Sequence, residues 1–198
     1  VISIDLDIQK MAEEKIAQAT SDYNAESGSV MVTDPSTGEI LAACSTPLMD
    51  PTDASSVTSD SMKLRLTGDS YEPGSIFKVL TMAVGIESGK VTPESTFTVP
   101  PKVQLDDVAG ANLGFMSFGQ GLAFPMVQVV RAVGAIANDG TMNVPHFLVQ
   151  KAGDTVDWSS KGTDTVSKAT CDKVTDMMRI VINEGTGTAA QVTGYDVA

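Results

Sequence analysis

The chain has 198 residues, which is enough for one sizeable domain or two small ones with a true hydrophobic core. Hydrophobic residues make up 42% of it and charged residues 19%, which is typical of a globular protein and excludes a disordered one. A net charge of −12, without any run of Lys or Arg, argues against binding to nucleic acid or to an anionic membrane surface.

The first predicted elements are a helix and a β-hairpin. Residues 7–22 have helical periodicity, with charged side chains opposite a face that carries Ile8, Met11, Ala12, Lys15 and Ile16. Two apolar runs over residues 28–45 flank the turn-forming sequence "DPSTG", which predicts a hairpin. Residues 46–62 are rich in Pro, Asp, Ser and Thr and predict a long loop.

Three further helices are predicted in the rest of the chain. The first, over residues 75–90, has an apolar stripe of Ile76, Val79, Leu80 and Ala83. Residues 124–140 predict a second, with Pro near its start and Gly140 past its end. Residues 167–185 predict a third, whose apolar period is Val174, Met177, Met178, Val181 and Ile182. Residues 95–105 and 144–153 predict extended segments, so the fold class is α/β or α+β.

Residues that bind metals or build a histidine triad are scarce. His146 is the single histidine, and Cys44 and Cys171 are not part of any CxxC motif, which argues against a zinc site and a Ser-His-Asp triad. Two free, buried thiols are expected, with a disulfide as the alternative. No apolar stretch approaches the roughly 18 residues of a membrane span, and no signal peptide is evident, so any anchor lies outside these residues.

The sequence "YEPGSIFK", residues 71–78, places Ser75 and Lys78 three residues apart at a helix start. Residues at this spacing share a helix face, so the Ser75 hydroxyl and the Lys78 amine can meet. A serine becomes a nucleophile when a base takes its proton, and a lysine is such a base only when burial or a nearby cation lowers its pKa from about 10.4. The motif S-x-x-K alone is weak, and a solvated lysine on an ordinary helix is the alternative.

The stretch around this pair resembles the nucleophile segment of penicillin-binding proteins, the peptidoglycan transpeptidases, which reads Tyr-Glu-Pro-Gly-Ser-Thr-Phe-Lys. Four more stretches resemble the same family in the same order: "ISIDLDIQKMAEE", "GSVMVTDPSTGEILAACSTP", "SFGQGLAFPMVQVVRAVGAIANDGTMNVPHFL" and "INEGTGTAAQVTGYDVA". The resemblance covers most of the chain and fits the class B, monofunctional branch. It implies a serine β-lactamase-like fold, with helices on both faces of a central antiparallel sheet and Ser75 at the start of a central buried helix.

The resemblance also implies an activity for residues 1–198 as a transpeptidase domain. Ser75 would attack the D-Ala-D-Ala carbonyl of a stem peptide, its backbone N–H would be an oxyanion donor, and Lys78 would be the general base. The implied partners are stem peptides ending in D-Ala-D-Ala, β-lactam antibiotics, a glycosyltransferase and other cell-wall proteins, but no nucleic acid. No metal or organic cofactor is implied. The family faces the outside of the bacterial cytoplasmic membrane on an N-terminal anchor.

Two family motifs are missing, because neither Ser-x-Asn nor Lys-[Thr/Ser]-Gly occurs in the 198 residues. In the family a helical subdomain with Ser-x-Asn precedes the "SFGQG" segment, so a helical segment is expected to be missing near residues 105–114. Lys-Thr-Gly would follow Ala198, so the domain is expected to be truncated there. Removing one oxyanion donor costs about 10²- to 10³-fold in rate, and the 198 residues alone are therefore expected to be a poor enzyme.

Two other functions stay open. A β-lactam-hydrolysing enzyme of class D type, or a β-lactam sensor domain, shares S-x-x-K, but no sequence feature for activating a deacylating water is evident. A non-catalytic pseudo-transpeptidase that scaffolds a cell-wall complex would fit the missing motifs.

The remaining polar residues and glycines have ordinary expected roles. Glu72 is expected to be an exposed first-turn acid, with a role in orienting the site as the alternative, and Ser117 a loop residue rather than a proton relay. Gly119 and Gly121 are expected to serve backbone conformation. His146 is expected to be structural. Thr186 and Thr188 are expected to shape the turn after the last helix.

Overall fold

The structure, a computed structural model, describes residues 1–98 and 108–198, and the chain divides into two compact units. Unit 1 comprises Val1–Tyr71, Phe124–Gly134 and Asn143–Gly162, and unit 2 comprises Glu72–Ala123, Ala135–Met142 and Thr163–Ala198. Each unit has a hydrophobic cluster of its own. The Ser-Lys pair lies in unit 2.

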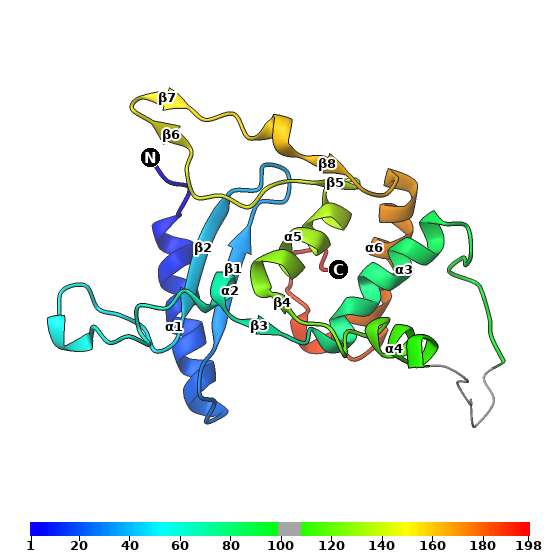
Figure 1. Ribbon diagram of the computed structural model, residues 1–198, viewed down its shortest axis with the longest axis horizontal. Helices are drawn as coiled ribbons and strands as arrows, with labels where there is room; N and C mark the ends of the chain where they lie inside the picture. Colours follow the sequence, from blue (N-terminus) through cyan, green and yellow to red (C-terminus); the bar gives the residue numbers. More distant parts are fainter. Residues whose placement is uncertain (99–107) are drawn as a thin grey trace. The chain divides into compact units, whose positions relative to one another are not determined.

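In unit 1 the predicted helix and hairpin are confirmed. Helix α1 (Leu6–Asp22) begins after Asp5, whose carboxylate accepts hydrogen bonds from two first-turn amides. Strands β1 (Ser29–Thr33) and β2 (Ile40–Ser45) pair in antiparallel fashion, and α1 lies along them (Figure 1). The buried residues at this contact are Ala12, Ala42 and Cys44, with Ile8 and Ile16 packed around them.

The predicted apolar face of α1 is wider than the buried one. Met11 is 60% exposed and Lys15 is exposed as well. A two-stranded hairpin covers only a narrow stripe of a helix, so residues at the edge of the predicted face remain in solvent.

The other elements of unit 1 are short. The predicted loop over 46–62 contains one turn of 3-10 helix, η1 (Ala54–Ser56). Helix α2 (Arg65–Gly68) buries Leu66. Strand β3 (Ser70–Tyr71) pairs with β4 (Phe124–Pro125), which leads into α5 (Met126–Ala137), the predicted second apolar helix, whose residues from Ala135 onward belong to unit 2. A second turn of 3-10 helix, η3, spans Ser159–Lys161.

A continuous strand over residues 144–153 is not formed, so that expectation was wrong. The segment makes isolated bridges at His146 and Leu148, and then strand β6 (Gln150–Lys151) turns into β7 (Asp154–Thr155). Pro145 has no amide to donate to a ladder, and the positive φ angles of Ala152 and Gly153 form the tight turn that ends the strand.

Unit 2 is built mainly from helices. A turn of 3-10 helix, η2 (Gly74–Phe77), leads into α3 (Lys78–Glu87), and α3 packs against α6 (Lys168–Glu184), the predicted last helix (Figure 1). Strand β5 (Thr141–Met142) pairs with β8 (Thr163–Asp164), and η4 (Thr188–Ala190) follows α6. Helix α4 spans Val108–Met116. Residues 95–98 carry no regular secondary structure, and the rest of the segment predicted over 95–105 lies outside the described residues.

The core of unit 2 lies between α3 and α6. Its buried residues are Ala83, Ile86, Ile136, Cys171 and Val174. Met177 and Met178 pack against them, as their helical spacing predicts, whereas Val181 is 48% exposed. Both cysteines of the chain are free and buried, which confirms the expectation of two thiols, and burial raises the pKa of each.

The predicted α/β or α+β fold class is confirmed, because the structure combines helices with antiparallel strands. Within residues 1–98 and 108–198 the strands pair as four two-stranded ladders. None of the helices in this part of the chain combines the length and apolar character needed to cross a bilayer.

Glu87 joins the end of α3 to the beginning of α6. Its carboxylate accepts hydrogen bonds from the Ser167 amide at 3.0 Å, the Ser167 hydroxyl at 2.7 Å and the Thr170 hydroxyl at 2.5 Å. Ser167 is itself the N-cap of α6. The hydrogen bonds from Thr170 and Ser167 hold the pKa of Glu87 below its usual value.

This link predicts a pH dependence of stability. Because the folded pKa of Glu87 is depressed, its stabilisation is complete above the unfolded value of about 4.3 and is lost as pH falls through the folded value. Glu87→Gln should therefore flatten the fall in the free energy of unfolding below that pH, measured by urea denaturation at a series of pH values. Glu94→Gln, at another exposed acid, should leave the slope unchanged. Parallel curves for Glu87→Gln and the wild type would contradict the prediction.

Candidate active site

The Ser-Lys pair lies where η2 passes into α3. Pro73 has helical dihedral angles and Gly74 has a φ of +62°, so the chain enters the turn sharply just before Ser75. The Lys78 Nζ donates a hydrogen bond to the Ser75 Oγ over 3.2 Å. The expected meeting of the two side chains is thus confirmed in geometry.

Both members of the pair are exposed to solvent. Among the described residues, α3 is buried at Ala83 and Ile86, in the cluster it shares with α6, whereas Val84 is 65% exposed and Ile76 of η2 is 54% exposed. A contact with one helix buries one stripe, so the described residues bury the expected central helix on one face.

The glycine segment, defined here as residues 117–121, lies against the nucleophile turn. The Gly74 N–H donates to the Gly119 carbonyl over 3.0 Å, and the Thr81 hydroxyl donates to the Ser117 carbonyl over 2.6 Å. Gly119 is buried and has a φ of +78°, and a Cβ on it would overlap the backbone of Gly74. The expected conformational role of this glycine is confirmed.

Glu72 also takes part in this contact, which the expectation of a plain first-turn acid missed. Its carboxylate accepts a hydrogen bond from the Gly121 N–H over 3.0 Å. Gly121 likewise has a positive φ, of +70°. The two residues are 49 positions apart, and no local sequence pattern could have joined them. Ser117 is a loop residue as expected, since it follows the end of α4. Its hydroxyl donates to the Gly114 carbonyl of that helix.

An open groove of about 450 Å³ begins at Glu72 and runs along the end of α4. The lining includes the apolar side chains of Phe115 and Met116, which are 52% and 38% exposed. The groove is lined by Glu72, Asn112, Phe115, Met116, Gln120 and Gly121. It is large enough for part of a peptide side chain or a small ring.

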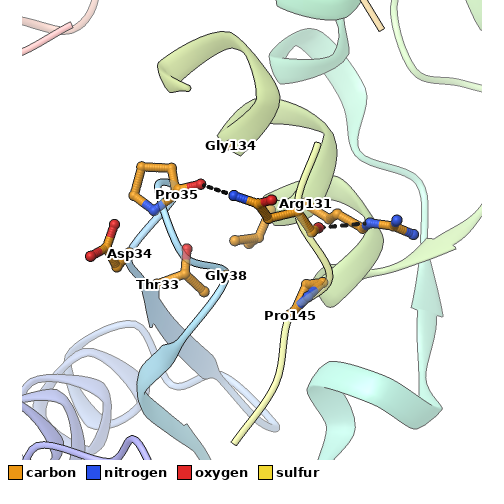
Figure 2. Close-up of a pocket in the computed structure, with 9 residues that line it drawn as sticks. Thr33, Asp34, Pro35, Gly38, Arg131, Gly134 and Pro145 are labelled. Atoms are coloured by element: carbon orange, nitrogen blue, oxygen red, sulfur yellow. Dashed lines mark hydrogen bonds between the residues drawn. The ribbon is translucent and has the colours of Figure 1, made fainter. Parts of the chain in front are cut away.

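A second hollow, shown in Figure 2, has a structural character. It measures about 20 Å³, room for one water molecule. The Arg131 Nε donates to the Asn143 carbonyl, and the Asn143 amide donates to the carbonyls of Pro35 and Ser36. These bonds tie the predicted "DPSTG" turn to α5 within unit 1.

The other residues considered from the sequence have structural surroundings. His146 is 7% exposed, lies with its Nδ1 2.8 Å from the Val144 carbonyl oxygen, and stacks on Trp158 at 4.5 Å between ring centroids. Thr186 and Thr188 lie in the turn after α6. In the described part of the chain no group of three or more His, Cys, Asp or Glu side chains is placed to hold a metal ion.

Comparison with known proteins identifies the family to which these elements correspond. The model of the penicillin binding protein transpeptidase domain matches residues 28–113 and 108–198. PenA of Neisseria flavescens, named a peptidoglycan D,D-transpeptidase, is 28% identical over an alignment that covers 100% of this chain and 65% of the relative. An FtsI protein of Caulobacter vibrioides with the same activity in its name is 35% identical over 48% of this chain and 16% of its own length.

Solved structures agree in fold. A protein of Atopobium parvulum, described as a peptidoglycan glycosyltransferase, superposes with a TM-score of 0.88 at 34% identity, over 99% of this chain and 62% of that one. Penicillin-binding protein 3 of Mycobacterium tuberculosis in complex with aztreonam superposes with a TM-score of 0.84 at 22% identity, over 98% of this chain and 62% of that one. The chain spans less than two thirds of the length of the curated relatives it matches.

Proposed function

Because the chain belongs to the penicillin-binding protein transpeptidase family, we propose that it is a serine-type peptidoglycan D,D-transpeptidase that cross-links stem peptides. The observation that supports the proposal most strongly is the distance of 3.2 Å between the Lys78 Nζ and the Ser75 Oγ, where η2 leads into α3. The family match includes both residues. A hydroxyl and an amine at this distance are close enough for the proton transfer that activates a serine, which supports these roles.

The proposed reaction has two steps. The Ser75 Oγ attacks the carbonyl carbon of the penultimate D-alanine while its proton passes to the neutral amine of Lys78. The C–N bond then breaks, and the departing D-alanine takes that proton, leaving an ester on Ser75. In the second step an amine of another stem peptide attacks the ester, a new amide bond forms, and the proton released by that amine returns to Ser75 through Lys78.

The position of Ser75 supports a role for its backbone as well. The N–H groups in the first turn of a helix have no partner within the helix, and they favour a developing negative charge. The Ser75 N–H would be one donor to the oxyanion of the tetrahedral intermediate. β-Lactams would acylate the same hydroxyl, because their ring amide has the position of the D-Ala-D-Ala bond.

We further propose that the chain lacks a helical segment near residues 105–114 that its relatives have. Two observations support this. The two parts of the family match meet at residues 108–113. The alignment with the Neisseria flavescens protein extends over 265 positions whereas the chain has 198 residues, so at least 67 positions of the relative have no counterpart here.

The substrates and location are part of the same proposal. The partners would be stem peptides ending in D-Ala-D-Ala, β-lactam antibiotics, and a glycosyltransferase with other cell-wall proteins. The site would face the outside of the bacterial cytoplasmic membrane, where peptidoglycan is assembled. Family membership supports these assignments.

The test is intact-protein mass spectrometry after incubation with benzylpenicillin. We expect a covalent adduct that persists for hours, together with release of D-alanine from a D-Ala-D-Ala peptide. An adduct that disappears within minutes would favour a β-lactam-hydrolysing enzyme. Failure of both reactions would contradict the proposal.

A further inference from the structure

We infer that Glu72 is a positioning residue, whose carboxylate holds the glycine segment against Gly74 and thereby fixes the peptide that carries the Ser75 N–H. Glu72 lies three residues before the nucleophile and accepts a hydrogen bond from the Gly121 N–H over 3.0 Å. The catalytic consequence of this contact rests on the proposed function, whereas the contact itself does not.

The two attachments of the glycine segment follow an antiparallel order. Glu72 binds Gly121, and two residues later the Gly74 N–H binds the Gly119 carbonyl over 3.0 Å. The side chain of Glu72 therefore continues a pattern that the backbone begins. Because Gly119 and Gly121 are both attached, the glycine segment has a defined register against residues 72–75.

The contact between the two backbones leaves no room for adjustment. A Cβ on Gly119 would overlap the carbonyl oxygen and nitrogen of Gly74, so the backbones touch directly. The Gly74 carbonyl and the Ser75 N–H belong to the same planar peptide. The Gly74 N–H that binds Gly119 lies on the other side of the Gly74 Cα, so a shift of the glycine segment reorients the Ser75 N–H by rotation about the φ and ψ angles of Gly74, which has no Cβ to restrict them.

This orientation matters for acyl transfer more than for stability. A misplacement of about 1 Å at a reacting centre costs about 10²-fold in rate, and loss of an oxyanion donor costs about 10²- to 10³-fold. Glu72 itself is exposed, so removal of its carboxylate leaves no buried group without a partner. A Glu72 variant is therefore expected to fold.

Three variants separate positioning from a general structural role. Glu72→Ala removes the acceptor, Glu72→Gln keeps an oxygen that accepts from the Gly121 N–H, and Glu94→Ala removes an exposed acid elsewhere in unit 2. For each, the acylation rate constant and the apparent dissociation constant for benzylpenicillin are taken from intact-mass time courses. Melting temperatures are recorded in parallel.

We expect Glu72→Ala to lower the acylation rate constant by about 10- to 100-fold, with little change in the dissociation constant or the melting temperature. Glu72→Gln should stay within about threefold of the wild type, because the hydrogen bond is retained. Glu94→Ala should match the wild type. Equal rates for Glu72→Ala and wild type, or a Glu72→Gln variant as slow as Glu72→Ala, would overturn the inference.

Amide hydrogen exchange tests the contact between Glu72 and the glycine segment independently of acylation. Glu72→Ala should speed exchange at Gly121 and Gly74, whereas Glu72→Gln and Glu94→Ala should not. Unchanged exchange in Glu72→Ala overturns the inference even if the enzyme is active. A wild-type protein that is never acylated contradicts the proposed function instead, while the exchange result still decides whether Glu72 holds the segment.

Discussion

Ser75→Ala is expected to abolish the covalent benzylpenicillin adduct, because it removes the hydroxyl that forms the ester. The variant keeps the turn, because the Ser75 side chain is exposed and accepts a hydrogen bond from the equally exposed Lys78. The measurement is the fraction of protein with the adduct mass as a function of time. The melting temperature should stay close to that of the wild type.

Ser88→Ala is the matched control. Ser88 lies at the other end of α3, is exposed, and donates only to the Gly85 carbonyl of its own helix. Its adduct should form at the wild-type rate. An adduct that forms on Ser75→Ala at an undiminished rate would place the acylated residue elsewhere and would remove the basis of the proposed mechanism.

Features determined by local periodicity could be predicted from the sequence. The bounds of α6 and the β1–β2 hairpin match residues 167–185 and 28–45 because apolar spacing and turn residues act within a few positions. The meeting of Ser75 and Lys78 belongs to the same class, since residues three apart on one helical turn need no other element to bring them together.

Features that depend on distant partners could not be predicted. The bond from Gly121 to Glu72 joins positions 49 residues apart, and the exposure of Met11 depends on how wide a hairpin α1 covers. The strand predicted over 144–153 does not form, because Pro145 has no amide hydrogen to donate and because the chain turns tightly after Lys151. The direct contact of Gly119 with Gly74 was likewise hidden, although two glycines in "SFGQG" suggested an unusual backbone.

The largest expected effect on stability is at Gly140. This residue lies in the turn after α5 with a φ of +96°, donates to the Ala135 carbonyl over 2.8 Å, and accepts from the Thr165 amide and hydroxyl. A Cβ at Gly140 would overlap the Val166 carbonyl oxygen. Gly140→Ala therefore combines a left-handed backbone with a clash against another part of the main chain, which a side-chain rotation does not relieve.

We expect Gly140→Ala to lower the free energy of unfolding by about 3 kcal/mol and the melting temperature by roughly 6–12 °C. Urea denaturation and differential scanning calorimetry measure the two quantities. Gly153→Ala is the matched control, because Gly153 has a similar φ of +93° but no atom within 4 Å of the added Cβ. That variant isolates the backbone strain, about 1 kcal/mol. Equal losses for the two variants would show that strain alone acts at Gly140, and that the backbone beside Val166 yields to the added carbon.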